Sequence, residues 1–139
     1  MTYLDALQTT LAGEHAALFV VGFLGAQTSQ SRSPQLYATL RESYAAHRDR
    51  RDLLEDRVRE AGAEPVAAAA SYDLPPVRAE DPTTIAAAGL AVERSCGATY
   101  GYLVANATGG ARRWAVAAVL DSALREIDLG GRPRTFPGR

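Results

Sequence analysis

Proline and glycine divide this chain of 139 residues into four long stretches that can each form one helix. The first proline is Pro34, so residues from about 2 to 28 can form an unbroken helix. Ser33-Pro34 and Asp81-Pro82 each place a capping residue before a proline, which suits the start of a helix. No stretch alternates between apolar and polar residues as a half-buried strand does. We therefore expect an all-α fold with helices at about 2-28, 34-61, 82-107 and 111-128.

The lengths of the connections predict how these helices are arranged. Short loops join the first two helices and the last two, which predicts two antiparallel hairpins. The link at 63-81 contains three prolines and reaches roughly 60 Å when extended, whereas a helix of about 28 residues is about 42 Å long. This link can therefore run the full length of a bundle. We predict a single domain over 1-139, a ferritin-like four-helix bundle with one long crossover and a flexible tail at 129-139.

An internal repeat supports the two-hairpin arrangement. The segment LAGEH, beginning at Leu11, recurs as LAVER at Leu90, and GFL at Gly22 recurs as GYL at Gly101. Both pairs have the same offset of 79 residues. The second and fourth helices share little beyond an acidic residue followed by serine. We interpret the first and third helices as copies within a duplicated helical hairpin.

Three polar residues lie within stripes of apolar residues that are spaced as the buried face of a helix. Glu14, His47 and Glu93 each lie about 12 or 13 residues from the start of their helix, so we expect them to meet at mid-height in the bundle. Tyr44 and Tyr100 lie on the same stripes and can hydrogen-bond to this cluster or simply pack. Because an unpaired buried carboxylate is strongly destabilising, the two glutamates require a metal ion, an arginine or a proton.

The fourth helix has an apolar stripe that predicts which of its faces is buried. The predicted buried residues are Ala117, Leu120, Leu124 and Ile127. Arg113 falls on the same face, Asp121 lies near its edge, and Glu126 lies well outside it. On this interpretation, Arg113 can reach the buried carboxylates of the other helices.

The polar cluster resembles half of a di-iron carboxylate site. A complete site takes one glutamate from each of two helices and Glu-x-x-His from each of the other two. Glu14 and Glu93 supply the first half, but Tyr44-x-x-His47 replaces one Glu-x-x-His and the fourth helix has no histidine. Glu14, His47, Glu93 and Asp121 are therefore the candidate ligands for one iron or manganese ion. In the alternative that we favour, a buried network of His47 and arginine neutralises the carboxylates, and the candidate arginines are Arg48, Arg51 and Arg113.

Several segments resemble one protein family. They are LAGEHAA from Leu11, GFLGA from Gly22, HRDRRDxL from His47, YDLP from Tyr72 and LAxE from Leu90. In this order they resemble the ferritin-like family of uncharacterised actinobacterial proteins known as domain of unknown function 4439. The resemblance implies a four-helix ferritin-like bundle, and it brings no established activity or catalytic residues.

Composition excludes several classes of function. The formal net charge is −1, and all 15 basic residues are arginine, so we expect no nucleic-acid binding and no lysine chemistry. The single cysteine, Cys96, cannot form an internal disulfide, and we expect it to be a small buried apolar residue. The apolar run Ala16–Ala26 is about half of what a membrane span needs, and the N-terminus lacks the features of a secretory signal. We expect a cytoplasmic protein that does not bind membranes.

Three functions remain open from the sequence. The first is a non-catalytic, cofactor-free structural or interaction protein, forming a homodimer through Phe19, Val20 and Phe23 on the first helix. The second is an oxidoreductase that uses iron or manganese at the buried glutamates and histidine. The third is a bundle that binds a small molecule of unknown identity in a pocket with the polar cluster at its floor.

Overall fold

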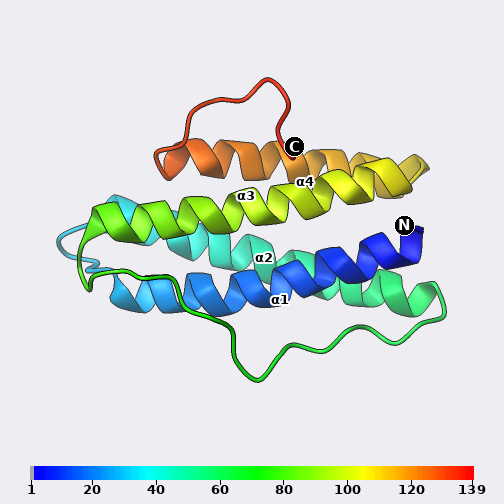
Figure 1. Cartoon of the computed structure of the whole chain (residues 1–139), viewed down its shortest axis with the longest axis horizontal. Coiled ribbons are helices and arrows are strands. Elements are labelled where there is room, and N and C mark those ends of the chain that lie inside the picture. The colour runs from blue at the N-terminus through cyan, green and yellow to red at the C-terminus, as the bar shows by residue number, and fades with distance from the viewer. Residues whose placement is uncertain (1) are drawn as a thin grey trace.

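The computed structural model describes residues 2–139, and the described part of the chain is helical without any strand. The helices are α1 (Tyr3–Gln27), α2 (Pro34–Glu60), α3 (Pro82–Asn106) and α4 (Gly109–Asp128). They form a four-helix bundle, which confirms the all-α prediction (Figure 1). Gly109 and Gly110 lie between the two last predicted helices, but in the structure they begin α4, because the backbone leaves the helical conformation earlier, at Ala107 and Thr108.

Local sequence sets the helix starts. At the start of α1, Thr2 accepts a hydrogen bond from the backbone N–H of Asp5, and the Asp5 carboxylate accepts one from the backbone N–H of Thr2. At the start of α3, the Asp81 side chain accepts from the backbone N–H groups of Thr83 and Thr84. These bonds satisfy N–H groups that have no partner within the helix.

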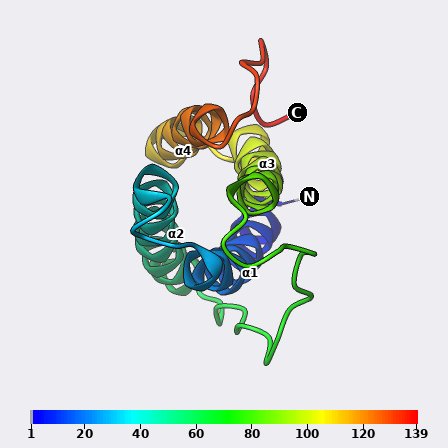
Figure 2. The ribbon, with the colours of Figure 1, turned by 90° about the vertical axis from the view of Figure 1, so that its left-hand side faces the viewer.

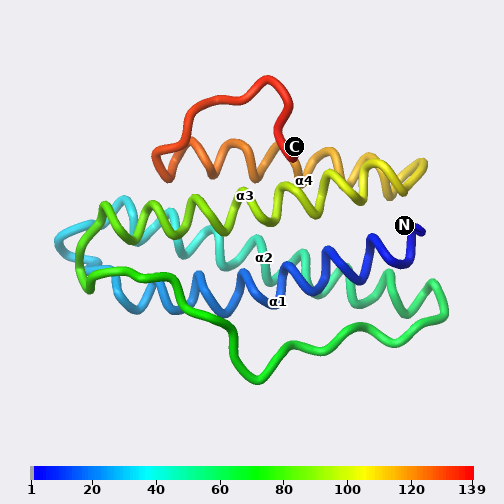
Figure 3. Tube along the Cα trace, in the orientation of Figure 1, coloured from blue at the N-terminus to red at the C-terminus, as the bar shows by residue number. Residues whose placement is uncertain are grey.

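The helices pair as two hairpins joined by one long connection. Helix α1 packs mainly against α2 and α3, and α3 packs mainly against α4. Viewed down the bundle, the four helices surround one common core (Figure 2). The connection between α2 and α3 runs alongside α1 for the length of the bundle, as its length predicted (Figure 3).

Side chains of α1 hold this crossover in place. The Gln8 side chain donates to the Glu64 carbonyl and accepts from the Val66 N–H, at 2.7 and 2.8 Å. His15 Nε2 lies 3.0 Å from the Val66 carbonyl oxygen. Further along, the ring of Phe19 packs against Tyr72 with 5.5 Å between centroids. The crossover therefore covers part of the α1 face that we expected to form a dimer interface.

Apolar side chains fill both ends of the bundle and leave a polar layer between them. One cluster, near the start of α1, includes Leu7, Leu11, Leu54, Val58 and Leu103. The cluster at the opposite end consists of Val21, Leu24, Leu40, Ile85 and Leu129. Each buried leucine or isoleucine of this kind contributes about 1.5–3 kcal/mol. The two ends therefore supply the hydrophobic stabilisation that allows polar groups to lie between them.

Helix α4 packs with the opposite face from the one that its leucines predicted. Its buried residues are Ala115, Ala118, Ser122 and Glu126. Leu120 and Leu124 are 57% and 64% exposed, and Ile127 is also exposed. The prediction failed because both faces carry the three- and four-residue spacing of a helix stripe, and the more apolar of the two points outward. Close approach of α4 to α3 instead requires the small residues.

The C-terminal residues fold back over α3 rather than extending into solvent, where a flexible tail was predicted. The backbone of Gly138 lies so close to Gly101 that a Cβ at position 101 would stand 2.6 Å from the Gly138 carbonyl oxygen. Arg134 of the same segment donates to the Glu126 carboxylate at 2.8 Å. The tail therefore supplies a positively charged partner for Glu126, a buried carboxylate of α4.

Helix α1 is long and apolar enough to cross a membrane, judged by length and composition alone. In the bundle, 44% of that apolar window is buried, and Glu14 lies within the same helix. Burial of this kind is also what the core helix of a soluble bundle shows.

Candidate functional site

The centre of the bundle holds a histidine between two glutamates. His47 Nδ1 lies 2.6 Å from Glu14 Oε2, and His47 Nε2 lies 3.0 Å from Glu93 Oε1. These side chains come from α2, α1 and α3 and are at most 1% exposed. An ionised carboxylate only accepts hydrogen bonds, so both ring nitrogens must donate and the ring is an imidazolium. The structure thus brings together the three residues that the sequence singled out.

The pKa values of the cluster agree with this charge state. Burial by itself lowers the pKa of His47, but hydrogen bonds to Glu14 and Glu93 and their negative charges raise it to about 9. Burial likewise opposes ionisation of Glu93, yet the hydrogen bond and charge of His47 hold the pKa of that carboxyl below its usual range. The cation and the carboxylates therefore stabilise one another at neutral pH.

Hydroxyl groups also donate hydrogen bonds to both carboxylates. Ser43 donates to Glu93 Oε1 at 2.6 Å, and Ser122 Oγ lies 2.9 Å from the Glu93 carbonyl and 3.2 Å from its Oε2. The Tyr100 hydroxyl donates to Glu14 Oε1. Over residues 2–139, every buried side-chain nitrogen or oxygen atom has a hydrogen-bond partner. The cluster is therefore satisfied by the chain's own groups.

An arginine extends the network toward α4. Arg50 donates to the Tyr100 hydroxyl at 3.2 Å and forms an ion pair with Asp121, to which Arg125 also donates at 2.9 Å. Burial opposes the charge on Arg50, but Tyr100 and Asp121 raise its pKa. Three cations (His47, Arg50, Arg125) thus balance three carboxylates (Glu14, Glu93, Asp121), and the network as a whole is neutral.

Four residues predicted for the cluster lie elsewhere. Arg48 is exposed beside Asp49, and Arg51 pairs with its neighbour Asp52. Arg113 is exposed on α4, because that helix presents its other face to the core. Tyr44 is 40% exposed, whereas Tyr100 is fully buried in the cluster. Helix geometry explains why Arg50 joins the cluster and Arg48 does not. Arg50 lies three residues after His47, so it shares the inward face of the helix.

The sequence contained a signal for the residues that were missed. Glu14 and Glu93 are separated by the 79-residue offset of the internal repeat, and the same offset relates Ser43 to Ser122 and His47 to Glu126. Both serines contact Glu93, and Glu126 is 3% exposed. The repeat thus predicts the buried face of α4, where the apolar pattern failed.

A candidate metal-binding group exists at the centre. Ligand atoms of Glu14, His47 and Cys96 lie within 4.8 Å of one another, and all three residues are buried. Burial and the two nearby glutamates raise the pKa of the Cys96 thiol, which opposes the thiolate that a metal would require. A metal would also have to displace a proton from His47 and break one of its two carboxylate bonds. A two-metal carboxylate centre does not fit, because α4 places Ser122 beside Glu93 and no ligating histidine.

Comparison with known proteins places the chain among helical proteins without an assigned activity. A family model described as Domain of unknown function (DUF4439) matches residues 6–139. The crystal structure of a conserved hypothetical protein from Mycobacterium tuberculosis is similar, with a TM-score of 0.81 and 26% identity, covering 90% of this chain and 92% of that one. A search of curated proteins finds no match. The family match agrees with the resemblance carried by the sequence segments.

Proposed function

Given that this chain belongs to the DUF4439 family, a domain of unknown function, we propose that it is a non-catalytic, ferritin-like bundle without a resident metal. On this proposal it acts in the cytoplasm by binding a second copy of itself. The absence of a resident metal is inferred from one observation, that Glu14 and Glu93 engage both nitrogens of His47, at 2.6 and 3.0 Å.

The imidazolium takes the role that a metal cation has in a carboxylate bundle. It lies between glutamates of two different helices and uses both of its donors to hold them together. Its single charge completes a neutral network with Arg50, Arg125 and the three carboxylates. A divalent ion would give that network excess positive charge even after His47 lost its proton, because the loss of one proton offsets only one of the two added charges. The cluster therefore supports cohesion of the bundle rather than redox chemistry.

Metal analysis of the purified protein tests this part of the proposal. Protein is produced with added iron and manganese, and the bound metal per chain is measured for the unmodified protein, for Glu14→Gln and for Glu126→Gln. Glu126 is a matched control, since it is a buried carboxylate outside the histidine cluster. We expect far less than one ion per chain in all three. One ion per chain that is lost in Glu14→Gln but kept in Glu126→Gln would contradict the proposal and favour the oxidoreductase alternative.

The outer face of α4 supports binding of a second copy. Val116, Leu120, Leu124 and Ile127 form an exposed apolar stripe along this helix. An exposed apolar stripe on a soluble bundle is typical of an interaction surface. The interface expected on α1 is less suitable, because Tyr72 of the crossover packs on Phe19.

The stripe is self-complementary when two α4 helices pack antiparallel. A two-fold axis beside Leu120 brings the same residue of the second copy against it and sets Val116 level with Leu124 of the second copy. Arg113 lies seven residues before Leu120 and Asp128 lies eight after it, so they meet across the interface on the same side. Both residues are exposed on α4. Charge and apolar surface therefore favour the same pairing.

The molar mass in solution tests the dimer. We expect a dimer for the unmodified protein and a monomer for Leu120→Arg, because this change places two arginines together on the axis. Leu74→Arg is the matched control, since Leu74 is 48% exposed on the crossover. Arg113→Asp and Asp128→Arg should each weaken the dimer, and the double variant should restore it. A monomeric unmodified protein, or a dimer that Leu120→Arg leaves intact, would contradict this surface.

A further inference from the structure

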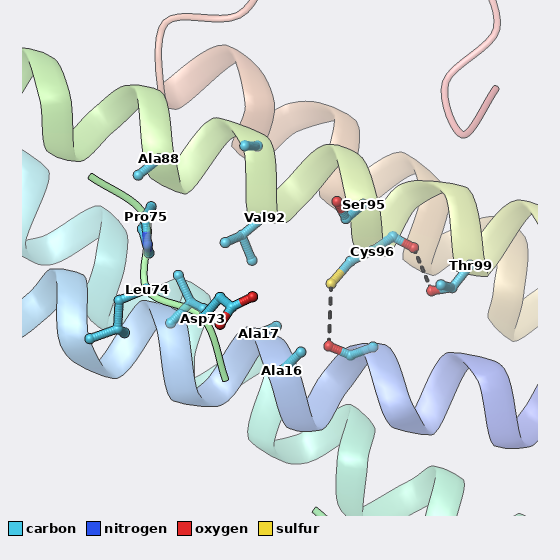
Figure 4. Close-up of a pocket in the computed structure, with 13 residues that line it drawn as sticks. Ala16, Ala17, Asp73, Leu74, Pro75, Ala88, Val92, Ser95, Cys96 and Thr99 are labelled. Atoms are coloured by element: carbon cyan, nitrogen blue, oxygen red, sulfur yellow. Dashed lines mark hydrogen bonds between the residues drawn. The ribbon is translucent and has the colours of Figure 1, made fainter. Parts of the chain in front are cut away.

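A cavity of about 410 Å³ lies between α1 and α3, beneath residues of the crossover (Figure 4). Its walls are small side chains, with Ala16 and Ala17 on α1 and Ala88 and Val92 on α3. Cys96 also lines it, with its thiol near the Gly13 carbonyl. The volume lies within the range of small-molecule sites. The cavity is separate from the outer face of α4, so it does not depend on the dimer.

The crossover adds one charge to this apolar space. Among residues 2–139, Asp73 is the only charged residue that lines the cavity, and its side chain extends from the crossover into the space between α1 and α3 (Figure 4). Within residues 2–139, no hydrogen bond or ion pair engages the Asp73 carboxylate. Its neighbours along the crossover, Leu74 and Pro75, also line the cavity. An apolar space with one unpaired carboxylate at its edge is complementary to an amphipathic cation.

We propose that this cavity binds an amine with an elongated apolar tail. The lining residues of α3 run from Ala88 to Thr99, which corresponds to about 16 Å along the helix. The tail lies along the alanines between α1 and α3, and the ammonium group donates hydrogen bonds to Asp73. The same carboxylate disfavours fatty acids and other anions of equal length. The polar cluster is not the floor of this site, since Glu14, His47 and Glu93 are not among the residues that line it.

Calorimetric titration with three probes of equal chain length tests the proposal. Octylamine, octanol and octanoate share the same apolar tail but differ in charge at pH 7. We expect octylamine to bind best, octanol roughly threefold more weakly, and octanoate weakest, because an exposed ion pair contributes only modestly. In Asp73→Asn, the advantage of octylamine over octanol should disappear. Asp49→Asn is the control, since Asp49 is an exposed acid on α2 outside the cavity.

A second variant tests whether the probes bind in this cavity. Ala91 lines the cavity and is exposed, so Ala91→Phe fills the space without disturbing the core. We expect this change to weaken octylamine and octanol alike by at least tenfold, while the melting temperature of the free protein stays the same. Failure of all three probes to bind would overturn the proposal. So would octylamine binding that persists in Ala91→Phe, or a preference for octylamine that persists in Asp73→Asn.

Discussion

Charged residues are buried at the centre of the bundle, whereas large apolar residues are exposed on the outer face of α4. Glu14, His47 and Glu93 lie in the dry interior, whereas Leu120 and Leu124 are more than half exposed. The interior tolerates its charges because each has a partner of opposite charge or a hydroxyl within hydrogen-bond distance. Within residues 2–139 the outer leucines have no such compensation, and in the proposed dimer a second copy would cover them.

Burial in this bundle therefore follows the fit between helices more than the polarity of single residues. Small residues let α3 and α4 approach, since Ser122 contacts the Glu93 backbone and Ala118 packs near Tyr100. Leucines at those positions of α4 would hold the helices apart. The inner face of α4 therefore carries small or polar residues, and its larger apolar side chains lie on the exposed face.

The largest expected effect comes from removing the central cation. His47→Leu leaves Glu14 and Glu93 buried without the group that holds them together. We expect the free energy of unfolding to fall by about 3–5 kcal/mol, measured by urea denaturation. Replacing all three residues by leucine should recover at least half of that loss, because no buried charge then lacks a partner. If the single and triple variants lose the same free energy of unfolding, the loss does not come from carboxylates buried without a partner.

The next effect is a loss of stability at alkaline pH. His47 has a pKa of about 9 in the folded state against an unfolded value near 6.5, so its contribution is complete below pH 6.5 and is lost as pH rises to 9. The loss amounts to about 3 kcal/mol over that interval. Denaturation at pH 6.5 and 9 measures it, with His47→Gln as the variant in which this pH dependence should disappear. A variant with an unchanged pH dependence would refute the assignment to His47.

A smaller effect is expected where the tail meets α4. Arg134 donates to Glu126, which is 3% exposed, while the arginine itself is one-third exposed. Arg134→Gln should therefore reduce the free energy of unfolding by about 1 kcal/mol, since solvent screens part of the pair. Glu126→Gln in the same background should remove most of this loss. If Arg134→Gln alone has no effect, the tail does not neutralise Glu126 in solution.

The smallest effect is expected for the arginines that the sequence wrongly assigned to the interior. Arg48 and Arg51 pair only with the adjacent aspartates on the surface of α2. Changing either to glutamine should alter the free energy of unfolding by less than about 0.5 kcal/mol. Arg50→Gln is the contrast, because it breaks a network that includes Tyr100 and Asp121. Equal effects of the changes at positions 48 and 50 would contradict the placement of the arginines.

The sequence was sufficient for the fold and for the core of the site. Proline positions and loop lengths predicted the helices, and polar residues within apolar stripes predicted Glu14, His47 and Glu93. The partners of these residues were harder to predict, because an arginine reaches a buried acid from several positions on a helix and only packing selects Arg50. The face of α4 was ambiguous for a different reason, since its two stripes have equal spacing. The internal repeat resolves this ambiguity by relating His47 to Glu126.

The protonation state of His47 decides whether an imidazolium holds the two glutamates together. Nitrogen NMR of the imidazole rings, recorded from pH 5 to pH 10 with His47→Gln to assign the signals, reports the protons on both nitrogens. We expect that Nδ1 and Nε2 of His47 both carry protons at pH 7 and that one is lost near pH 9. A neutral ring at pH 7, with one nitrogen free of hydrogen, would contradict it.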